Sequence, residues 1–195
     1  MEVNQSTIIL AALGLSLSLS ATNAIAAQYT LEPDHSYATW GVNHFGFSKV
    51  TGKVKAEGTL SLDESNLQNS SVNVTLNMND LDTGVSSKFD SMLKSSKFFN
   101  VESFPTATFV STSVEGKEKH SLKVNGTLTL HGVSKPVTLA VRVNKIGAHP
   151  YYGTSAAGFS AVAHLKRSEF GLGAYSPGVS DEVVVEIEVE AKKGS

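Results

Sequence analysis

The chain has 195 residues, in which 16 Lys and Arg stand against 18 Asp and Glu, and it contains no cysteine. A formal net charge of −2 excludes the strongly basic surface that binds nucleic acid, and it offers no general electrostatic hold on anionic lipid. The lack of cysteine excludes disulfides and thiolate chemistry, so the fold must be stabilised by its own hydrophobic core.

Residues 1–26 have the pattern of a signal peptide. The segment from Ile8 to Leu19 is apolar, and Ala24-Ile25-Ala26 fits the small-x-small rule for cleavage. The run is too short to span a membrane, which takes about 18 apolar residues or more. We therefore expect export of the protein from a bacterial cell's cytoplasm, with one mature domain over residues 27–195.

Eight segments of the mature chain alternate apolar and polar residues with the period of a β-strand. They are 38–44, 50–63, 72–78, 107–112, 122–130, 137–143, 159–165 and 183–189. No helix alternates with them, so the pattern predicts an all-β fold with one antiparallel sheet. Long strands favour closure into an eight-stranded barrel over an open sandwich.

The apolar faces of these strands carry many small residues, which we expect to leave space inside the barrel. They are Gly52, Ala56, Gly58, Gly126, Ala161 and Ala163. A barrel of about eight strands can be filled by its own side chains or can hold one small ligand. Both alternatives remain open from the strand pattern.

One short helix is predicted between the third and fourth of these strands, within residues 86–109. Phe89, Met92 and Leu93 follow the i, i+3, i+4 spacing of one helix face, and Ser87 is the predicted N-cap. Pro105 ends the segment. We expect the helix to cross one end of the barrel, with these apolar side chains pointing inward, either as a fixed plug or as a moving lid.

Phe98 and Phe99 follow the helix and are expected to anchor it. Lys88, Lys94 and Lys97 flank the apolar residues, which predicts transient contact with a membrane while lipid is loaded.

The candidate chemistry is sparse. The six histidines do not share the spacing of metal ligands on one strand face, and no nucleophile, base and orienting group occur together. His44 shares a strand face with Trp40, so it is expected to present one polar group inside an apolar cavity. Arg167 is expected to pair with Asp181 or Glu182 at the rim of the barrel; a contact with the substrate is the alternative. We therefore predict no enzyme, no catalytic residues, no metal and no cofactor other than a bound lipid.

The chain resembles the YceI-like family of exported bacterial proteins through five motifs in order. They are His35-Ser36 with Trp40, Val42, His44 and Gly46; Leu93-Lys94-Ser95 with Phe98-Phe99-Asn100-Val101-Glu102 and Pro105-Thr106-Ala107-Thr108-Phe109; the run from Gly126 to Val137; Arg167-Ser168-Glu169-Phe170-Gly171-Leu172; and Asp181-Glu182-Val183. Where relatives often carry a His before the residue equivalent to Leu93, this chain has Met92.

The resemblance implies a lipocalin-like barrel whose elongated apolar tunnel binds a polyisoprenoid, a quinone-type molecule or another long-chain lipid. It also implies secretion to the periplasm. The expected ligand-binding residues are Trp40, Val42, His44, Phe89, Met92, Leu93, Phe98, Phe99, Phe109, Leu128, Val141, Phe159 and Ala161. The partners expected are such a lipid and a membrane surface, with no nucleic acid; a homodimer is left open.

The leading interpretation is a periplasmic carrier of an isoprenoid-like lipid. One alternative is a stress-related interaction module with a filled barrel and no ligand, in which Ala161→Trp or Gly58→Phe destabilises the fold by overpacking. In the carrier, the same changes should block lipid while the fold survives. A second alternative is an enzyme that acts on a lipid headgroup with His44 as its base.

Overall fold

The structure is a computed structural model that describes residues 26–118 and 120–194. Residues 1–25, and with them nearly all of the predicted signal peptide, lie outside the described residues. The strands are β1 (Ala27–Leu31), β2 (Tyr37–His44), β3 (Ser48–Leu62), β4 (Ser71–Asn77), β5 (Thr106–Glu115), β6 (Leu122–Leu130), β7 (Val133–Ala148), β8 (Ser155–Lys166) and β9 (Glu182–Lys193). The helices are α1 (Ser87–Lys94) and three single 3-10 turns, η1 (Leu67–Asn69), η2 (Met78–Asp80) and η3 (Arg167–Phe170).

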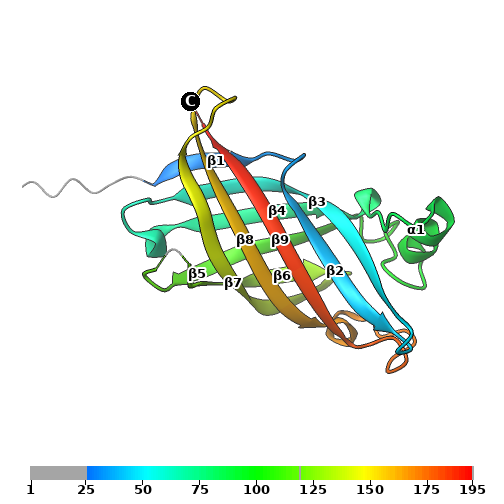
Figure 1. The fold of residues 1–195 in the computed structure, drawn as a ribbon. Helices are drawn as coiled ribbons and strands as arrows, with labels where there is room; N and C mark the ends of the chain where they lie inside the picture. The colour runs from blue at the N-terminus through cyan, green and yellow to red at the C-terminus, as the bar shows by residue number, and fades with distance from the viewer. Residues whose placement is uncertain (1–25, 119, 195) are drawn as a thin grey trace, which may run out of the picture.

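The strands form one closed antiparallel barrel with eight positions around its wall (Figure 1). From β3 to β9 each strand pairs with the next, and β1 and β2 together close the gap between β9 and β3. β1 pairs with the far parts of β3 and β9, whereas β2 pairs with Ser48–Lys55 and with Val184–Glu188. The predicted eight-stranded barrel is therefore confirmed, with one wall position shared by two short strands.

Ser36 holds the break between β1 and β2. Its side chain is fully buried; its hydroxyl donates to the Glu190 carbonyl at 3.0 Å, and it accepts from the Glu190 amide at 3.2 Å. The sequence prediction missed β1, because five residues are too few to show an alternating pattern. The helix lies in the predicted segment, but because β1 was missed it falls between the fourth and fifth strands, β4 and β5, and not between the third and fourth.

The inward faces of the strands form two buried clusters, one toward each end of the barrel. Tyr29, Leu62 and Leu67 belong to the cluster near β1. Val54, Leu81 and Leu93 belong to the cluster near α1, against which Trp40, Phe98 and Phe99 pack. The alternation read from the sequence therefore describes the core correctly, because a strand presents every second side chain to the same face.

Two of the small inward residues accommodate aromatic rings and leave no empty space. A Cβ at Gly52 would lie 2.4 Å from the indole of Trp40, and one at Gly126 would lie 2.4 Å from the ring of Phe109. The expectation that these glycines provide cavity space was wrong, because the rings of neighbouring strands occupy it. A Cβ at Gly58 would lie 2.1 Å from the Asn73 carbonyl oxygen, so Gly58→Phe would disrupt the β3–β4 pairing and is no test of cavity filling.

α1 lies at one end of the barrel (Figure 1). Its N-cap is Ser86 and not Ser87 as predicted: the Ser86 hydroxyl accepts from the Phe89 amide at 3.2 Å. Leu93 is buried, whereas Met92 is 43% exposed, so only part of the predicted apolar face packs inward. In the described part of the chain, no helix is long and apolar enough to cross a lipid bilayer.

Candidate functional site

The barrel encloses an apolar cavity of about 650 Å³. Side chains from β2 to β9 line it, and alanines such as Ala56, Ala161 and Ala163 supply the room that larger residues would fill. Cavities of about 300–1,000 Å³ are typical of sites for small organic ligands. The barrel therefore has an interior suited to an apolar guest.

Every residue predicted to bind the ligand lies on this cavity. They are Trp40, Val42 and His44 on β2, Phe89, Met92 and Leu93 on α1, Phe98 and Phe99 after it, and Phe109, Leu128, Val141, Phe159 and Ala161 on β5, β6, β7 and β8. The period-2 faces and the helical spacing bring them together from six elements. Their contact with a ligand stays a prediction.

The segment after α1 packs beneath the helix and borders the cavity. The Phe99 ring lies 6.1 Å from the Trp40 indole, and the Phe98 ring stacks on Tyr175 at 6.1 Å. Phe99 also donates its amide to the Leu93 carbonyl at 3.0 Å. The segment after α1 therefore connects this end of the cavity to β2 and to the loop before β9.

Trp40 is the only tryptophan of the chain and lines the cavity. Among the described residues, its indole Nε1 is the one buried side-chain nitrogen or oxygen without a hydrogen-bond partner. A buried donor left unpaired costs free energy that an ordinary core residue does not incur. The indole is also a built-in fluorescent reporter of what occupies the cavity.

The turn between β2 and β3 forms part of the cavity mouth. Phe45 has φ 53° and Gly46 has φ 77°, and the Phe47 amide donates to the His44 carbonyl at 3.0 Å. Positive φ is costly for a bulky side chain such as Phe. The Phe45 amide donates to the Gly178 carbonyl at 2.7 Å, which ties this turn to the loop before β9. Phe45 and Tyr175 both line the cavity and are about half exposed, so the cavity reaches the surface there.

Arg167 lines the same end of the cavity, and the expectation that it pairs with Asp181 or Glu182 was wrong. Its guanidinium donates to the backbone carbonyls of Leu172, Ala174, Val179 and Ser180. The curled loop between η3 and β9 presents these carbonyls, so backbone geometry decided the contact. An Arg that directly follows a long strand whose alternate residues face inward was the signal that could have placed it at the cavity.

The Asp181 carboxylate accepts instead from the amide and the hydroxyl of Ser168, at 2.8 and 2.7 Å. The Ser168 hydrogen bonds lower the pKa of Asp181, with a smaller contribution from the Arg167 charge. The sequence reading also missed Tyr175 and Lys97 as cavity residues. Neither lies in a periodic segment that could have shown which way its side chain points.

Polar groups near β1 are satisfied by one another. The Asp63 carboxylate accepts from the amide and hydroxyl of Ser65, the Asn66 amide and the Asn69 side chain, at 2.6–3.0 Å. These hydrogen bonds, that of the Ser65 hydroxyl first, lower the pKa of Asp63 to about 2. This network shapes the loop around η1, whose Leu67 is buried against the core.

The tyrosines at this end are also paired with carboxylates. The Tyr29 hydroxyl donates to Glu64 at 3.0 Å, and the Tyr152 hydroxyl donates to Glu190. The hydrogen bond to Glu190 is the main cause that raises the pKa of Tyr152 to about 12. His149 stacks on Tyr152 with ring centroids 3.7 Å apart.

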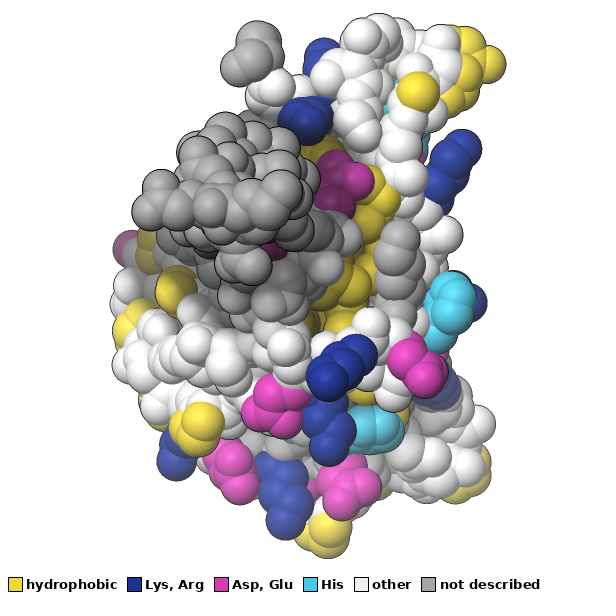
Figure 2. Space-filling view, turned by 90° about the vertical axis from the view of Figure 1, so that its left-hand side faces the viewer, with side chains coloured by type: hydrophobic (Ala, Val, Ile, Leu, Met, Phe, Trp, Pro, Cys, Tyr) yellow, Lys and Arg dark blue, Asp and Glu magenta, His cyan; other side chains and the backbone are white. Residues whose placement is uncertain are grey.

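Figure 2, which faces the end of the barrel away from α1, shows hydrophobic side chains near the centre with charged side chains around them.

The described residues contain no group of three His, Cys, Asp or Glu side chains that could hold a metal ion. The His44 ring stacks edge-on against Phe45 at 4.8 Å, and within that part of the chain no side chain donates to it or accepts from it. A general base is normally oriented by a second polar group. Among the described residues, no side chain orients the His44 ring in this way.

Comparison with known proteins identifies the family. The YceI-like domain matches residues 29–191, which is nearly the whole described barrel. The chain belongs to the YceI-like family. The YceI proteins of Salmonella arizonae and Salmonella enteritidis are each 39% identical over 178 residues, which cover 90% of this chain and 92% of theirs.

Solved structures share the fold of this YceI-like chain. Burkholderia cenocepacia BcnA superimposes with a TM-score of 0.73 at 22% identity, over 82% of this chain and 98% of BcnA. Campylobacter jejuni YceI superimposes with a TM-score of 0.70 at 28% identity, over 78% of this chain and 90% of that protein. A polyisoprenoid-binding domain from Saccharophagus degradans superimposes with a TM-score of 0.58 at 14% identity, over 87% of this chain and 99% of that domain. At this identity the similarity shows a shared fold only.

Proposed function

We propose that this YceI-like protein binds and carries a long-chain isoprenoid or similar amphiphilic lipid in its barrel. The observation that carries the proposal is the apolar cavity of about 650 Å³, walled by side chains from nearly every strand. Membership of the YceI-like family supports it, as does the shared fold of a domain described as polyisoprenoid-binding. Both favour a binding protein over an enzyme.

Burial of the lipid tail supplies the driving force. Each methylene removed from water contributes about 0.8 kcal/mol, so a long chain needs few polar contacts to bind. The walls formed by Phe109, Leu128 and Phe159 are apolar along the barrel. The filled-barrel alternative, by contrast, predicts no internal space of this size.

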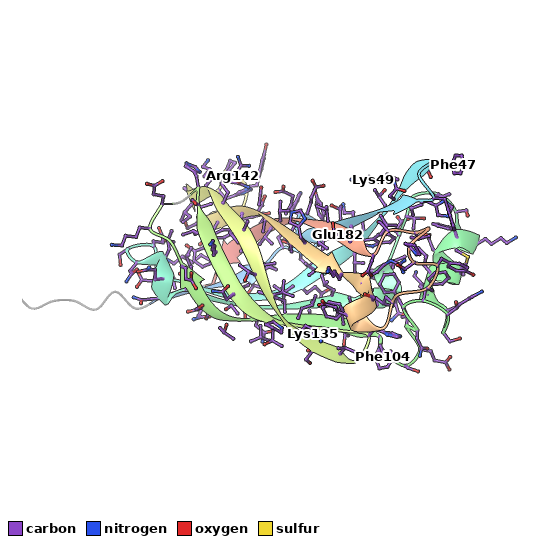
Figure 3. The ribbon with its side chains drawn as sticks, turned by 90° about the horizontal axis from the view of Figure 1, so that it is seen from below. Phe47, Lys49, Phe104, Lys135, Arg142 and Glu182 are labelled. Atoms are coloured by element: carbon purple, nitrogen blue, oxygen red, sulfur yellow. The ribbon has the colours of Figure 1, made fainter. Side chains whose placement is uncertain are left out.

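Loading takes place, in this proposal, where the cavity mouth contacts a membrane. Phe47 at the tip of the β2–β3 turn is 92% exposed, and Phe45 beside it is 51% exposed and lines the cavity. Figure 3 shows Phe47 projecting from the molecule at the same end as α1, with Lys49 on the adjoining strand. Exposed aromatic residues next to lysines suit insertion into the interface of an anionic membrane. The lipid would then pass from bilayer to cavity without crossing water.

The periplasm is the compartment in which this carrier would act, since the predicted signal peptide directs export there. A homodimer stays a prediction, which light scattering of the purified mature protein would check.

The test is to purify the mature protein from its natural host without detergent and to examine it by native mass spectrometry. A bound lipid with a long hydrocarbon tail is expected, and displacement by an added prenyl compound should change the fluorescence of Trp40. If neither co-purified lipid nor uptake of any prenyl compound is found, the carrier function is rejected.

A further inference from the structure

The charged side chains that line the cavity are all basic. Among the described residues they are Lys97 and Arg167, with His44 as the one further ionisable basic group, and no Asp or Glu lines the cavity. A purely apolar tail requires no charge beside it. The charge distribution therefore bears on the polar end of the ligand.

These three residues lie at the same end of the barrel, although they are far apart in the sequence. All three converge on the loop from Ala174 to Val179. Lys97 Nζ lies 5.3 Å from the centre of the Tyr175 ring, Arg167 donates to the Val179 carbonyl at 2.8 Å, and His44 is bridged to Val179 through the backbone. The loop thus brings basic groups from β2, from the segment after α1 and from η3 to one mouth.

Neither Arg167 nor Lys97 forms an ion pair with any described residue. The carbonyl oxygens that accept from Arg167 orient its guanidinium and solvate the charge without cancelling it, and they leave one of its N–H groups unused. The nearby Asp181 is engaged by Ser168 and does not line the cavity. The mouth therefore has basic groups whose acidic partner is missing from the described chain.

We propose that the ligand is an anionic amphiphile, whose phosphate or carboxylate headgroup sits between Lys97 and Arg167 while its tail extends toward β1. This inference rests on the proposed carrier function and specifies the headgroup. Guanidinium and ammonium groups donate charge-assisted hydrogen bonds to such oxyanions. A neutral alcohol or quinone would leave both positive charges without a counter-ion.

The experiment compares three ligands with the same tail: geranylgeranyl phosphate, geranylgeranoic acid and geranylgeraniol. Affinities are measured with delipidated mature protein by the change in Trp40 fluorescence. We expect the phosphate, the acid or both to bind at least about fivefold more tightly than the alcohol, and this preference should shrink as salt is added. The arm that binds more tightly identifies the headgroup as phosphate or carboxylate.

Lys97→Gln is the first variant, because the exposed Lys97 side chain makes no hydrogen bond that the fold needs. It should weaken the two anionic ligands by about threefold to tenfold and leave geranylgeraniol unchanged. The matched control is Lys123→Gln, on the outer face of β6, which should change none of the three affinities. Arg167→Lys, which keeps the charge but loses the carbonyl-binding fork, should lower the affinity for anions more than that for the alcohol.

Two results would overturn the inference separately from the carrier function. If geranylgeraniol binds as tightly as both anions, the carrier remains and the anionic headgroup is rejected. If Lys97→Gln weakens the alcohol and the anions equally, Lys97 acts by packing and the headgroup assignment fails. If none of the three compounds binds, the inference is rejected; the carrier function is rejected with it only if no lipid co-purifies and no other prenyl compound is taken up.

Discussion

The two ends of the barrel differ in how their charged side chains are paired. Near β1, the Asp63 carboxylate receives hydrogen bonds from Ser65, Asn66 and Asn69, and Tyr152 donates to Glu190. At the α1 end, Lys97 and Arg167 border the cavity without a carboxylate to pair with among the described residues. Charged groups that are paired within the protein stabilise the fold, whereas charged groups without a counter-ion at a cavity point to a ligand.

The two ends also differ in whether their exposed aromatic residues line the cavity. Near α1 the exposed aromatic residues Phe45 and Tyr175 also line the cavity, whereas Tyr151 near β1 is 89% exposed and does not. Exposure alone is therefore no sign of function; continuity with the cavity is what distinguishes the α1 end.

The largest expected effect comes from filling the cavity that joins the two ends. Ala161→Trp places an indole where the ligand tail should lie, so uptake of a prenyl compound should fall by more than about tenfold while the fold survives. Val162→Trp, one residue along on the outer face of β8, is the matched control and should bind normally. Lipid uptake is measured by native mass spectrometry and folding by circular dichroism. If Ala161→Trp unfolds the protein and Val162→Trp does not, the filled-barrel alternative regains support.

The second prediction tests whether α1 is a fixed plug, packed against the core at its end of the barrel, or a moving lid. Leu93 is 8% exposed within the cluster of Val54 and Leu81, so Leu93→Ala should lower the free energy of unfolding by about 3 kcal/mol. Met92→Ala, at a residue 43% exposed, should cost less than about 1 kcal/mol. Urea denaturation measures both. Equal, small losses would show that α1 is a lid detached from the core, and would decide between the two alternatives left open by the sequence.

A smaller effect is expected at the membrane. Phe47→Ser should weaken binding to anionic phospholipid vesicles by roughly threefold to tenfold, since one partly buried aromatic ring is lost from the interface. Stability should stay within about 0.5 kcal/mol because the ring is exposed. Tyr151→Ser removes an equally exposed ring near β1 and serves as the control in the same sedimentation assay. A loss of vesicle binding in both variants, or in neither, would contradict a membrane-facing α1 end.

The smallest effect concerns the satisfied network near β1. The pKa of Asp63 is lowered from 3.8 to about 2. Its ionised carboxylate therefore stabilises the fold fully at pH values above 3.8, and this contribution is lost as the pH falls toward 2. Asp63→Asn keeps one acceptor oxygen and should lower the urea midpoint modestly at neutral pH. The difference from the unchanged protein should shrink on acidification. A difference that is constant from neutral pH to pH 2 would show that ionisation of Asp63 does not matter.

Much of the cavity could be predicted from the sequence. Alternation placed Val42, Leu128 and Phe159 on inward faces, and the spacing of Phe89 and Leu93 placed a helix face toward the barrel; all of them line the cavity. Such periodic signals are local, because the strand and helix periods alone decide which side chains share a face. Whether these residues bind a ligand is a separate question that the experiments above address.

What lay beyond prediction depended on contacts between distant segments. Arg167 was expected to pair with Asp181 or Glu182, but it donates to backbone carbonyls of the loop before β9. That loop has no periodic sequence pattern from which its conformation could be predicted. The ring of Trp40 fills the space next to Gly52, and the ring of Phe109 fills the space next to Gly126. The register between strands decides which side chains face each other, and the sequence does not show that register.

The sequence by itself determined the class of fold, the inward faces, the helix within residues 86–109 and the membership of a family, since each follows from local pattern or from motifs in order. Only the tertiary structure decided that β1 and β2 share one position in the barrel, and that the charged cavity-lining groups among the described residues are all basic. Closure of the barrel brings His44, Lys97 and Arg167 to one mouth. No spacing along the chain encodes that meeting, because it arises from pairing between strands and from one loop that all three residues contact.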